Sequence, residues 1–187
     1  MLENDIQLVE STLKGDIRGF EKLVERYQML AMKYIYNIVK DSTTTEDICQ
    51  EVFITVYNKL DTYNKKYKFS NWLIQIAKNK AIDYVRKRNK VKTLNIEDAY
   101  NVSSNEISPE ENAELKETKS TINNYLKTLN EQDKQILLLK YSTERTFKDI
   151  SLILKIPEST VKRRFYKVRQ EFKKYILGLE KRCEYEL

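Results

Sequence analysis

The residues best suited to chemistry lie between Phe147 and Tyr175, where the sequence predicts a short helix, a tight turn and a longer helix. In the longer helix, apolar residues recur every three or four positions and so form one stripe that must be buried. That stripe consists of Val161, Phe165, Val168, Phe172 and Tyr175. The opposite face carries hydroxyls, an amide and cations, which suit base edges and phosphates: Ser159, Lys162, Arg163, Tyr166, Lys167, Gln170 and Lys174.

The segment before this helix favours a helix-turn-helix. Thr146 can cap a short helix whose inner side carries Ile150 and Ile153. Pro157 suits the first position of the next helix. In a helix-turn-helix the second helix enters the major groove of DNA. From charge alone, a solvated basic face on an ordinary bundle helix would be the better interpretation, so the turn and the preceding helix carry the prediction.

A helix predicted from Ser70 to Arg88 carries a second candidate surface. Its inward stripe is Leu73, Ala77, Ala81 and Tyr84, and its outward stripe is Trp72, Ile76, Asn79, Asp83 and Arg86. An aromatic ring can stack on a base, an amide can bond a base edge, and Arg can hold a phosphate. The preceding loop, Asp61 to Phe69, interleaves aromatic residues with lysines, as a single-strand binding loop would. Alternatively, Trp72 and Phe69 simply plug the helix junction, and for Trp72 the sequence does not decide.

A third helix, predicted from about Thr45 to Leu60, has a different outward face. Its inward residues are Cys49, Val52, Phe53, Val56 and Leu60, and its outward residues are Glu46, Asp47, Gln50, Glu51, Ile54 and Asn58. An acidic surface with one exposed Ile is poor for DNA and good for a basic protein partner. From charge alone, however, a solvated face is the simpler interpretation.

Composition excludes several classes of function. The chain has 187 residues, 34 Lys and Arg against 28 Asp and Glu, and no His, so the commonest general base and metal ligand are missing. With only 3 Gly and 2 Pro, the sequence favours helices over a sheet and contains no phosphate-binding glycine loop. No apolar run is long enough to span a membrane and no secretory signal is evident. We therefore expect a cytoplasmic protein that needs no metal or cofactor. Composition does not exclude an enzyme, but its chemistry would have to come from carboxylates and lysines alone, and no paired arrangement suggests it, so our prediction is that the chain is not an enzyme.

The predicted fold class is all-α, with two small helical domains joined by an acidic flexible linker. The predicted boundaries are residues 1–90 for the first domain, 91–117 for the linker and 118–187 for the second domain, which contains the helix-turn-helix. Between 91 and 117 the helical pattern disappears, apolar residues are few and acidic residues dominate, as in a tether.

Together these segments resemble the extracytoplasmic-function sigma factors of the sigma-70 family, over nearly the whole chain. The opening of the chain, with Leu13 to Asp16 and Phe20 to Tyr27, is similar to the segment with which these factors begin. The other matching segments are Glu46 to Phe53, Phe69 to Leu73 with Ile76 to Asn79, and Ile156 to Arg164. Each piece alone is only suggestive, whereas four in the family's order are highly specific.

The resemblance implies a function and partners. The chain would bind core RNA polymerase, through the clamp of the largest subunit and the flap of the second largest, and direct it to promoter DNA. An anti-sigma factor would inhibit it, and its acidic linker would thread the polymerase's nucleic-acid channel. It would not insert into a membrane.

The resemblance also implies roles for individual residues. Polymerase binding would use Asp47, Gln50, Glu51 and Ile54. Duplex DNA at the −35 element would be contacted by Ser159, Thr160, Lys162, Arg163, Arg164 and Lys167. Single-stranded DNA at the −10 element would be contacted by Lys66, Tyr67, Phe69, Trp72, Asn79, Asp83 and Arg86, with Asn79 holding a flipped base.

The sequence departs from the family pattern in two places. Lys155 stands at a turn position that is often Gly, so the turn is expected to need a positive φ there. Arg163 and Arg164 place an extra cation where a small residue is common, which would change promoter preference.

Three other functions remain to be weighed. A stand-alone helix-turn-helix regulator would bind operator DNA without polymerase, but leaves the acidic face and the Trp72 stripe without a task. A DNA recombinase would need a nucleophile among clustered arginines, and before Arg86 the chain offers only Arg18 and Arg26. An all-helical adaptor without a DNA role is the third.

Overall fold

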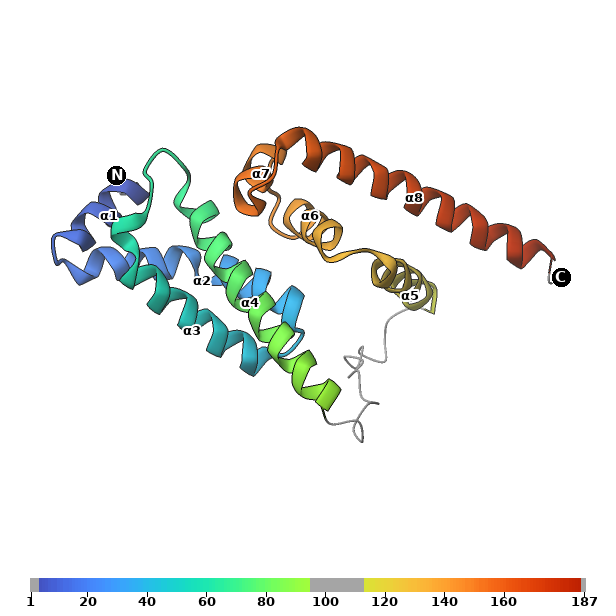
Figure 1. Cartoon of the computed structure of the whole chain (residues 1–187), viewed down its shortest axis with the longest axis horizontal. Coiled ribbons are helices and arrows are strands. Elements are labelled where there is room, and N and C mark those ends of the chain that lie inside the picture. Colours follow the sequence, from blue (N-terminus) through green and yellow to red (C-terminus); the bar gives the residue numbers. More distant parts are fainter. Residues whose placement is uncertain (1–3, 95–112, 186–187) are drawn as a thin grey trace.

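A computed structural model describes residues 4–94 and 113–185, and all of its regular structure is helical (Figure 1). The first group of elements is α1 (Asp5–Leu13), α2 (Ile17–Val39), α3 (Ser42–Asn58), the 3-10 turn η1 (Leu60–Thr62) and α4 (Phe69–Leu94). The second group is α5 (Ala113–Thr128), α6 (Glu131–Tyr141), α7 (Phe147–Leu154) and α8 (Glu158–Tyr185). The predicted all-α class with two helical domains is therefore confirmed.

In the N-terminal domain α2, α3 and α4 pack around one apolar core, with α1 lying across α2. Polar caps start the helices: Asn4, Asp16 and Asp41 accept hydrogen bonds from the first-turn amides of α1, α2 and α3. Gly19 lets α1 approach closely, because a Cβ atom there would lie 2.7 Å from the carbonyl oxygen of Leu8. The core is built from fully buried side chains of all four helices, among them Leu8, Leu23, Ile35, Val52, Leu73 and Ile74.

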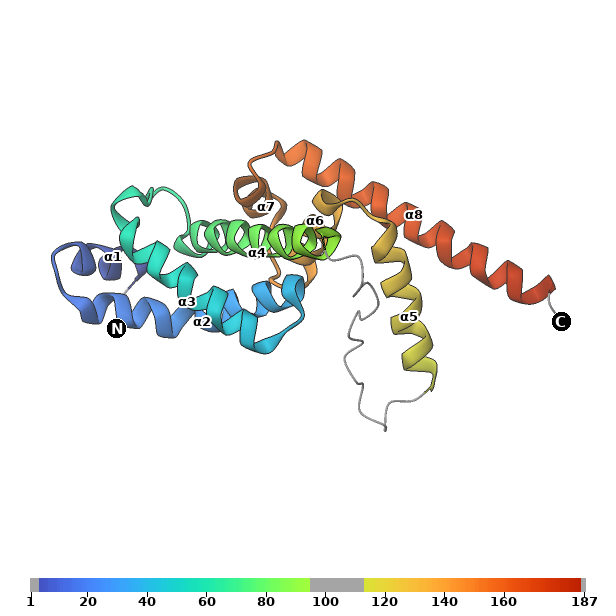
Figure 2. The ribbon, with the colours of Figure 1, turned by 60° about the horizontal axis from the view of Figure 1, so that its bottom comes forward.

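In the C-terminal domain α6, α7 and α8 form the helix-turn-helix and its support (Figure 2). Thr146 caps α7 as predicted, and its hydroxyl and the Asp149 carboxylate bond each other's backbone amides in a capping box. The turn to α8 passes through Lys155 at φ 56°, which confirms the positive φ expected there. The predicted buried stripe of α8 is buried at Val161, Phe165 and Val168, so the opposite face of the helix is turned to solvent.

Replacing Lys155 by Gly should stabilise the C-terminal domain. A residue with a Cβ pays about 1 kcal/mol or more for the left-handed conformation, whereas Gly does not, although Gly makes the unfolded chain more flexible. We expect the free energy of unfolding in urea to rise by about 0.5 kcal/mol. Lys148→Gly, at an exposed position within α7, is the control and should lower it by about 1 kcal/mol. If both variants lost the same free energy of unfolding, the backbone at Lys155 would not be strained.

The helices extend into the predicted linker from both sides. Helix α4 continues to Leu94 and α5 begins at Ala113, while the rest of the acidic segment, 95–112, lies outside the described residues. Within the two described ranges, no helix is both long and apolar enough to cross a membrane. The two domains touch: α4 packs against α7, and α2 lies against α6.

Candidate nucleic-acid and partner interfaces

The first half of α8 presents the predicted duplex-binding face to solvent. Ser159, Lys162, Arg163 and Lys167 are exposed, and Thr160 is half-buried. Lys162 pairs with Glu158 at 2.7 Å and Lys167 with Glu171 at 3.6 Å, both one helical turn away. Exposed pairs of this kind contribute little stability, so both lysines remain available to phosphates.

Arg164 differs from the other members of this set. Its guanidinium donates hydrogen bonds of 2.8 Å to Asp133 and 2.8 Å to Asn130, the residue that caps α6. It therefore fixes the recognition helix to the start of α6. The family resemblance placed Arg164 among the residues that contact the −35 element and gave no sign of these partners.

A second polar face runs along α4. Asn79, Asp83 and Arg86 are exposed and follow one another at intervals of four and three residues, so they lie in line along the helix. Asp83 and Arg86 approach only to 3.9 Å and stay accessible. Trp72 and Ile76, which begin the same line, are half-buried.

The loop before α4 is anchored by an aromatic cluster. Phe69 is 0% exposed, and its ring centroid lies 5.4 Å from Tyr27, 5.4 Å from Tyr63 and 5.8 Å from Trp72. Phe69 therefore plugs the helix junction, the simpler of the two interpretations. Tyr67 is exposed, together with Lys66. The half-buried Trp72 belongs to the cluster and still presents part of its surface.

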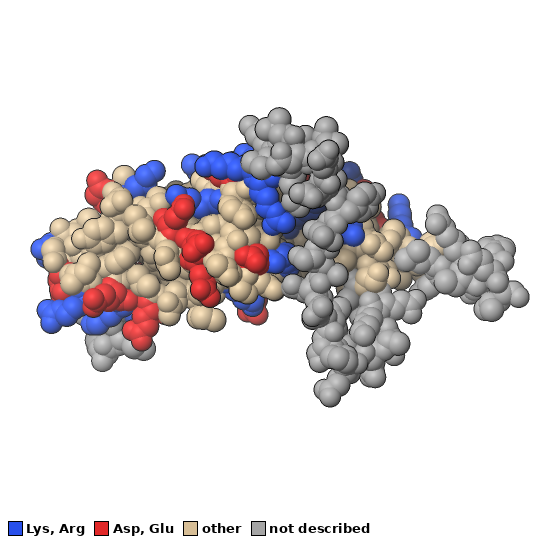
Figure 3. All heavy atoms as spheres, turned by 90° about the horizontal axis from the view of Figure 1, so that it is seen from below, with Lys and Arg blue, Asp and Glu red and all other residues tan. Residues whose placement is uncertain are grey.

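The acidic face of α3 is exposed throughout. Glu46, Asp47, Gln50, Glu51 and Asn58 all face solvent, and Ile54 is 61% exposed. Figure 3 shows acidic side chains gathered on the side of the molecule where α3 lies. Lys80 of α4 bonds Glu51 at 2.9 Å, which steadies one edge of this face. The surface combines negative charge with one exposed apolar side chain, as a protein-binding site does.

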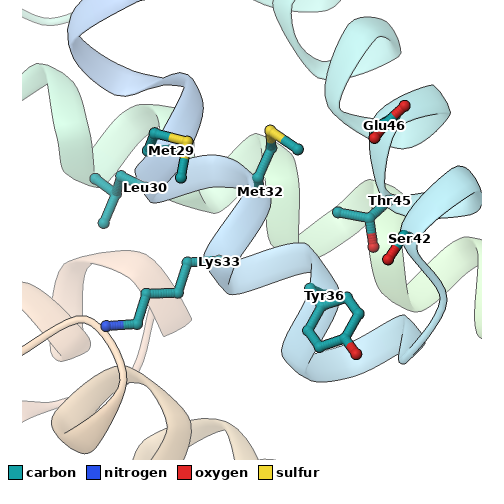
Figure 4. Close-up of a pocket in the computed structure, with 8 residues that line it drawn as sticks. All are labelled: Met29, Leu30, Met32, Lys33, Tyr36, Ser42, Thr45 and Glu46. Atoms are coloured by element: carbon teal, nitrogen blue, oxygen red, sulfur yellow. The ribbon is translucent and has the colours of Figure 1, made fainter. Parts of the chain in front are cut away.

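A hollow beside this face escaped the sequence analysis. A cavity of about 460 Å³ lies between α2 and α3, and Figure 4 shows Met32 between the two helices with Thr45 and Glu46 opposite. Met29 at its rim is 69% exposed. Methionine side chains adapt to the shape of a partner, so the hollow extends the acidic face with an apolar contact. The spacing of Met29 and Met32 on α2 was the available signal.

The structure also brings together residues that sequence reasoning did not connect. Arg145, just before α7, donates hydrogen bonds to Ser70 Oγ at 2.9 Å and to Asn71 Oδ1 at 3.2 Å. The Asn71 amide donates to Asp149 at 2.7 Å, and Lys68 donates to the other oxygen of Asp149 at 3.2 Å. We call these five residues the interdomain latch. A separate bond of 3.0 Å joins Asn37 of α2 to Ser142.

The latch perturbs the titration of its own charged groups. Burial lowers the pKa of the Arg145 guanidinium, and the nearby Asp149 partly offsets this. Burial alone would raise the pKa of Asp149, but hydrogen bonds from Asn71, Thr146 and Lys68 outweigh it and lower the pKa to about 2. The Asp149 carboxylate is therefore ionised at neutral pH.

The depressed pKa of Asp149 predicts an acid-dependent loss of stability. Its contribution, about 2 kcal/mol, is complete above the unfolded pKa of about 4 and disappears as the pH falls to about 2. Between pH 5 and pH 2, the unfolding free energy of the wild type should therefore fall by about 2 kcal/mol more than that of Asp149→Asn. Asp61→Asn, at an exposed position, controls for the loss of one charge. If the unfolding free energies of the wild type and Asp149→Asn changed in parallel with pH, the acid-dependent loss could not be attributed to Asp149.

Comparisons with known proteins agree over almost the whole chain. The models for sigma-70 region 2 and sigma-70 region 4 match residues 23–91 and 125–171. The chain is 30% identical over 179 residues to the ECF RNA polymerase sigma factor SigW of Bacillus subtilis (strain 168), covering 91% of this chain and 96% of SigW. It is also 30% identical over 174 residues to the ECF RNA polymerase sigma-E factor of Escherichia coli (strain K12), covering 89% and 91% of the two chains.

Two solved structures share the fold. CnrH in complex with the cytosolic domain of CnrY superimposes with a TM-score of 0.64 at 17% identity, covering 91% of this chain and 96% of that one. The sigma factor RpoE in complex with the anti-sigma factor NepR from Bartonella quintana gives 0.63 at 17% identity, covering 84% and 96%.

Proposed function

Since this chain belongs to the extracytoplasmic-function sigma factors of the sigma-70 family, and is thus an RNA polymerase sigma factor, we propose that three separate surfaces divide the work of initiation. The acidic face of α3 docks on the clamp of the polymerase's largest subunit. The exposed face of α8 binds the −35 element as duplex, and the exposed face of α4 holds the −10 element as single strand.

The observation that carries this division is the placement of the three faces on three different helices. Asp47 and Gln50 on α3, Asn79 on α4 and Arg163 on α8 are all exposed. Because the three sets of residues lie on three different helices, one chain has a separate surface for the enzyme, the duplex and the opened strand. The cation-rich face supplies phosphate contacts, and its hydroxyls supply base contacts.

At the −35 element, α8 inserts its first turns into the major groove, with Ser159, Thr160, Lys162, Arg163 and Lys167 facing the DNA. Arg164 supports this set through its bonds to Asp133 and Asn130. The C-terminal domain also contacts the flap of the second-largest subunit.

At the −10 element, Asn79 bonds the edge of a base extruded from the duplex. Asp83 and Arg86 lie beside it, and Lys66, Tyr67 and Trp72 guide the strand past the loop before α4. Unstacking a base costs a few kcal/mol, which hydrogen bonds and stacking in the site offset. Phe69 acts from within by holding the aromatic cluster on which this loop rests.

The chain itself contributes binding and no catalysis, since phosphodiester synthesis belongs to the polymerase. The related folds of CnrH and RpoE are bound by CnrY and by the anti-sigma factor NepR, which supports an anti-sigma partner for this chain too. We place its action in the cytoplasm, where core polymerase and promoter DNA are found.

Transcription in vitro tests the proposal. Purified chain is added to core polymerase on a template carrying the DNA upstream of this protein's own gene. We expect a discrete transcript that needs both chain and polymerase. Capture of core polymerase by the immobilised chain separates this function from that of a stand-alone operator-binding regulator. DNA binding without polymerase capture or transcript would establish the regulator instead.

A further inference from the structure

Helix α1 lies beside the loop that precedes α4, at one end of the N-terminal domain (Figure 1 and Figure 2). It comes before the match to sigma-70 region 2, which begins at residue 23. Its apolar side is buried in the core of the domain, with Leu8 1% exposed and Val9 0% exposed. Apolar packing thus accounts for the inner side of α1, whereas two acidic residues of this helix, Asp5 and Glu10, bond to other elements.

Asp5, in the first turn of α1, bonds two neighbouring residues of α2. Its carboxylate accepts hydrogen bonds from Arg26 Nη1 at 2.6 Å and from the Tyr27 hydroxyl, and its side chain is only 25% exposed. Burial, followed by the hydrogen bond to Asp5, raises the pKa of the Tyr27 hydroxyl, which therefore stays protonated and donates. Charge-assisted hydrogen bonds are short and directional, so this contact fixes the position of the Tyr27 ring.

The Tyr27 ring transmits this placement to both ends of the loop. Its centroid lies 5.4 Å from that of the fully buried Phe69, whose ring in turn lies 5.8 Å from Trp72 and 5.4 Å from Tyr63. The Tyr63 hydroxyl donates a hydrogen bond to the carbonyl oxygen of Tyr67 within the loop. Because close-packed aromatic rings transmit displacements to their neighbours, a shift of Tyr27 moves the residues on which the loop rests.

A second contact of α1 holds the middle of the loop. Lys65 Nζ donates to Glu10 Oε1 at 2.6 Å, joining residues that are 55 positions apart in the chain. The hydrogen bond and the charge of Lys65 lower the pKa of Glu10. Lys66 and Tyr67, which follow directly, are exposed. An exposed ion pair contributes little stability, so the effect of this contact is on where the loop lies.

We propose that α1 positions this loop for single-stranded DNA, with Asp5 and Glu10 as the positioning residues. Asp5 acts through Tyr27 on the aromatic cluster, and Glu10 acts through Lys65 on the middle of the loop. Since the loop is already held in one arrangement, binding of the strand does not have to order it. The inference deepens the proposed function and rests on the role of the loop at the −10 element.

Fluorescence of the free chain tests the first contact. Trp72 is the only tryptophan of the sequence, so its emission reports on the aromatic cluster. Tyr27→Phe removes the hydroxyl that reaches Asp5 and keeps the ring. Losing one partner of a partly buried hydrogen bond loosens the cluster, so acrylamide should quench Trp72 about twofold more strongly. Tyr57→Phe, the same change at an exposed position of α3, should leave quenching unchanged.

Reversing the charges of the second contact tests its effect on promoter opening. Glu10→Lys and Lys65→Glu, each alone, bring like charges together and should slow opening by about threefold. Glu10→Lys adds a cation, which by charge alone would favour DNA binding, so its loss of opening is a signature of positioning. The double variant restores opposite charges and should open the promoter at the wild-type rate. Permanganate footprinting of unpaired thymines measures opening, and polymerase affinity should be unchanged in all three variants.

Two results would overturn the positioning role of α1. One is equal quenching of Trp72 in the wild type and Tyr27→Phe. The other is a double charge reversal that opens the promoter no faster than the single variants. Failure of the wild type to open any promoter, together with stronger quenching in Tyr27→Phe, would support the coupling of α1 to the loop and count against the proposed function.

Discussion

Replacing Asp47 and Gln50 together by alanine is expected to weaken binding to core polymerase by about 100-fold. The two side chains lie one turn apart on the exposed face of α3. Because both face solvent, truncating them to alanine leaves the core of the domain undisturbed. Removing one charged and one neutral hydrogen-bonding group from an interface costs about 3 kcal/mol together. Titration of labelled chain with core polymerase, followed by fluorescence anisotropy, measures the change.

The control variant removes the same kinds of group from another helix. Glu21→Ala with Gln28→Ala truncates one carboxylate and one amide on exposed positions of α2. It should bind polymerase within about twofold of the wild type. Unaltered affinity in the Asp47 and Gln50 variant, or an equal loss in both variants, would refute docking through α3.

Asn79→Ala is expected to slow promoter opening by roughly 10- to 100-fold while leaving polymerase affinity intact. The Asn79 amide is exposed on α4, and in the proposed complex it bonds the flipped base. The loss leaves base atoms unpaired in a desolvated site, which costs about 1–3 kcal/mol. Permanganate footprinting of unpaired thymines measures opening, and the anisotropy titration measures docking.

Asn124→Ala provides the matched change at an exposed position of α5. It should leave both opening and docking as they are in the wild type. If Asn79→Ala lowered opening and docking in parallel, the side chain would act through the fold of the domain and the base-binding role would be wrong.

The sequence predicted the faces of the helices well because each face follows from periodicity within one element. On α3, Cys49, Val52 and Phe53 are buried while Asp47 and Gln50 are exposed, as the spacing required. The cap at Thr146 was predictable for the same reason, since it is a local property of a helix end, whereas the positive φ at Lys155 was expected from the resemblance to the family, which often has Gly there.

Contacts between distant segments were not predictable from one sequence. Arg164 directly follows the exposed Arg163, yet it bonds Asp133 and Asn130, about 30 residues earlier. Arg145 and Asp149 meet Ser70 and Asn71 across more than 70 residues of chain. No periodicity within a helix records such pairings, so the assignment of Arg164 and the latch required the fold.

A cavity of about 680 Å³ between the two domains has a consequence for small molecules that could bind this protein. Its walls come from both domains, with Ile38, Ile82 and Val85 on one side and Leu126, Leu137 and Phe172 on the other. A small molecule that fills this cavity contacts both domains and loses its contacts with one of them if the domains separate. It therefore binds preferentially to the arrangement in which the two domains touch. By mass action, at a concentration 100 times its dissociation constant, it would favour that form by about 2.7 kcal/mol. Such a molecule would hold the two domains together without occupying the exposed faces that carry Asp47, Asn79 and Arg163.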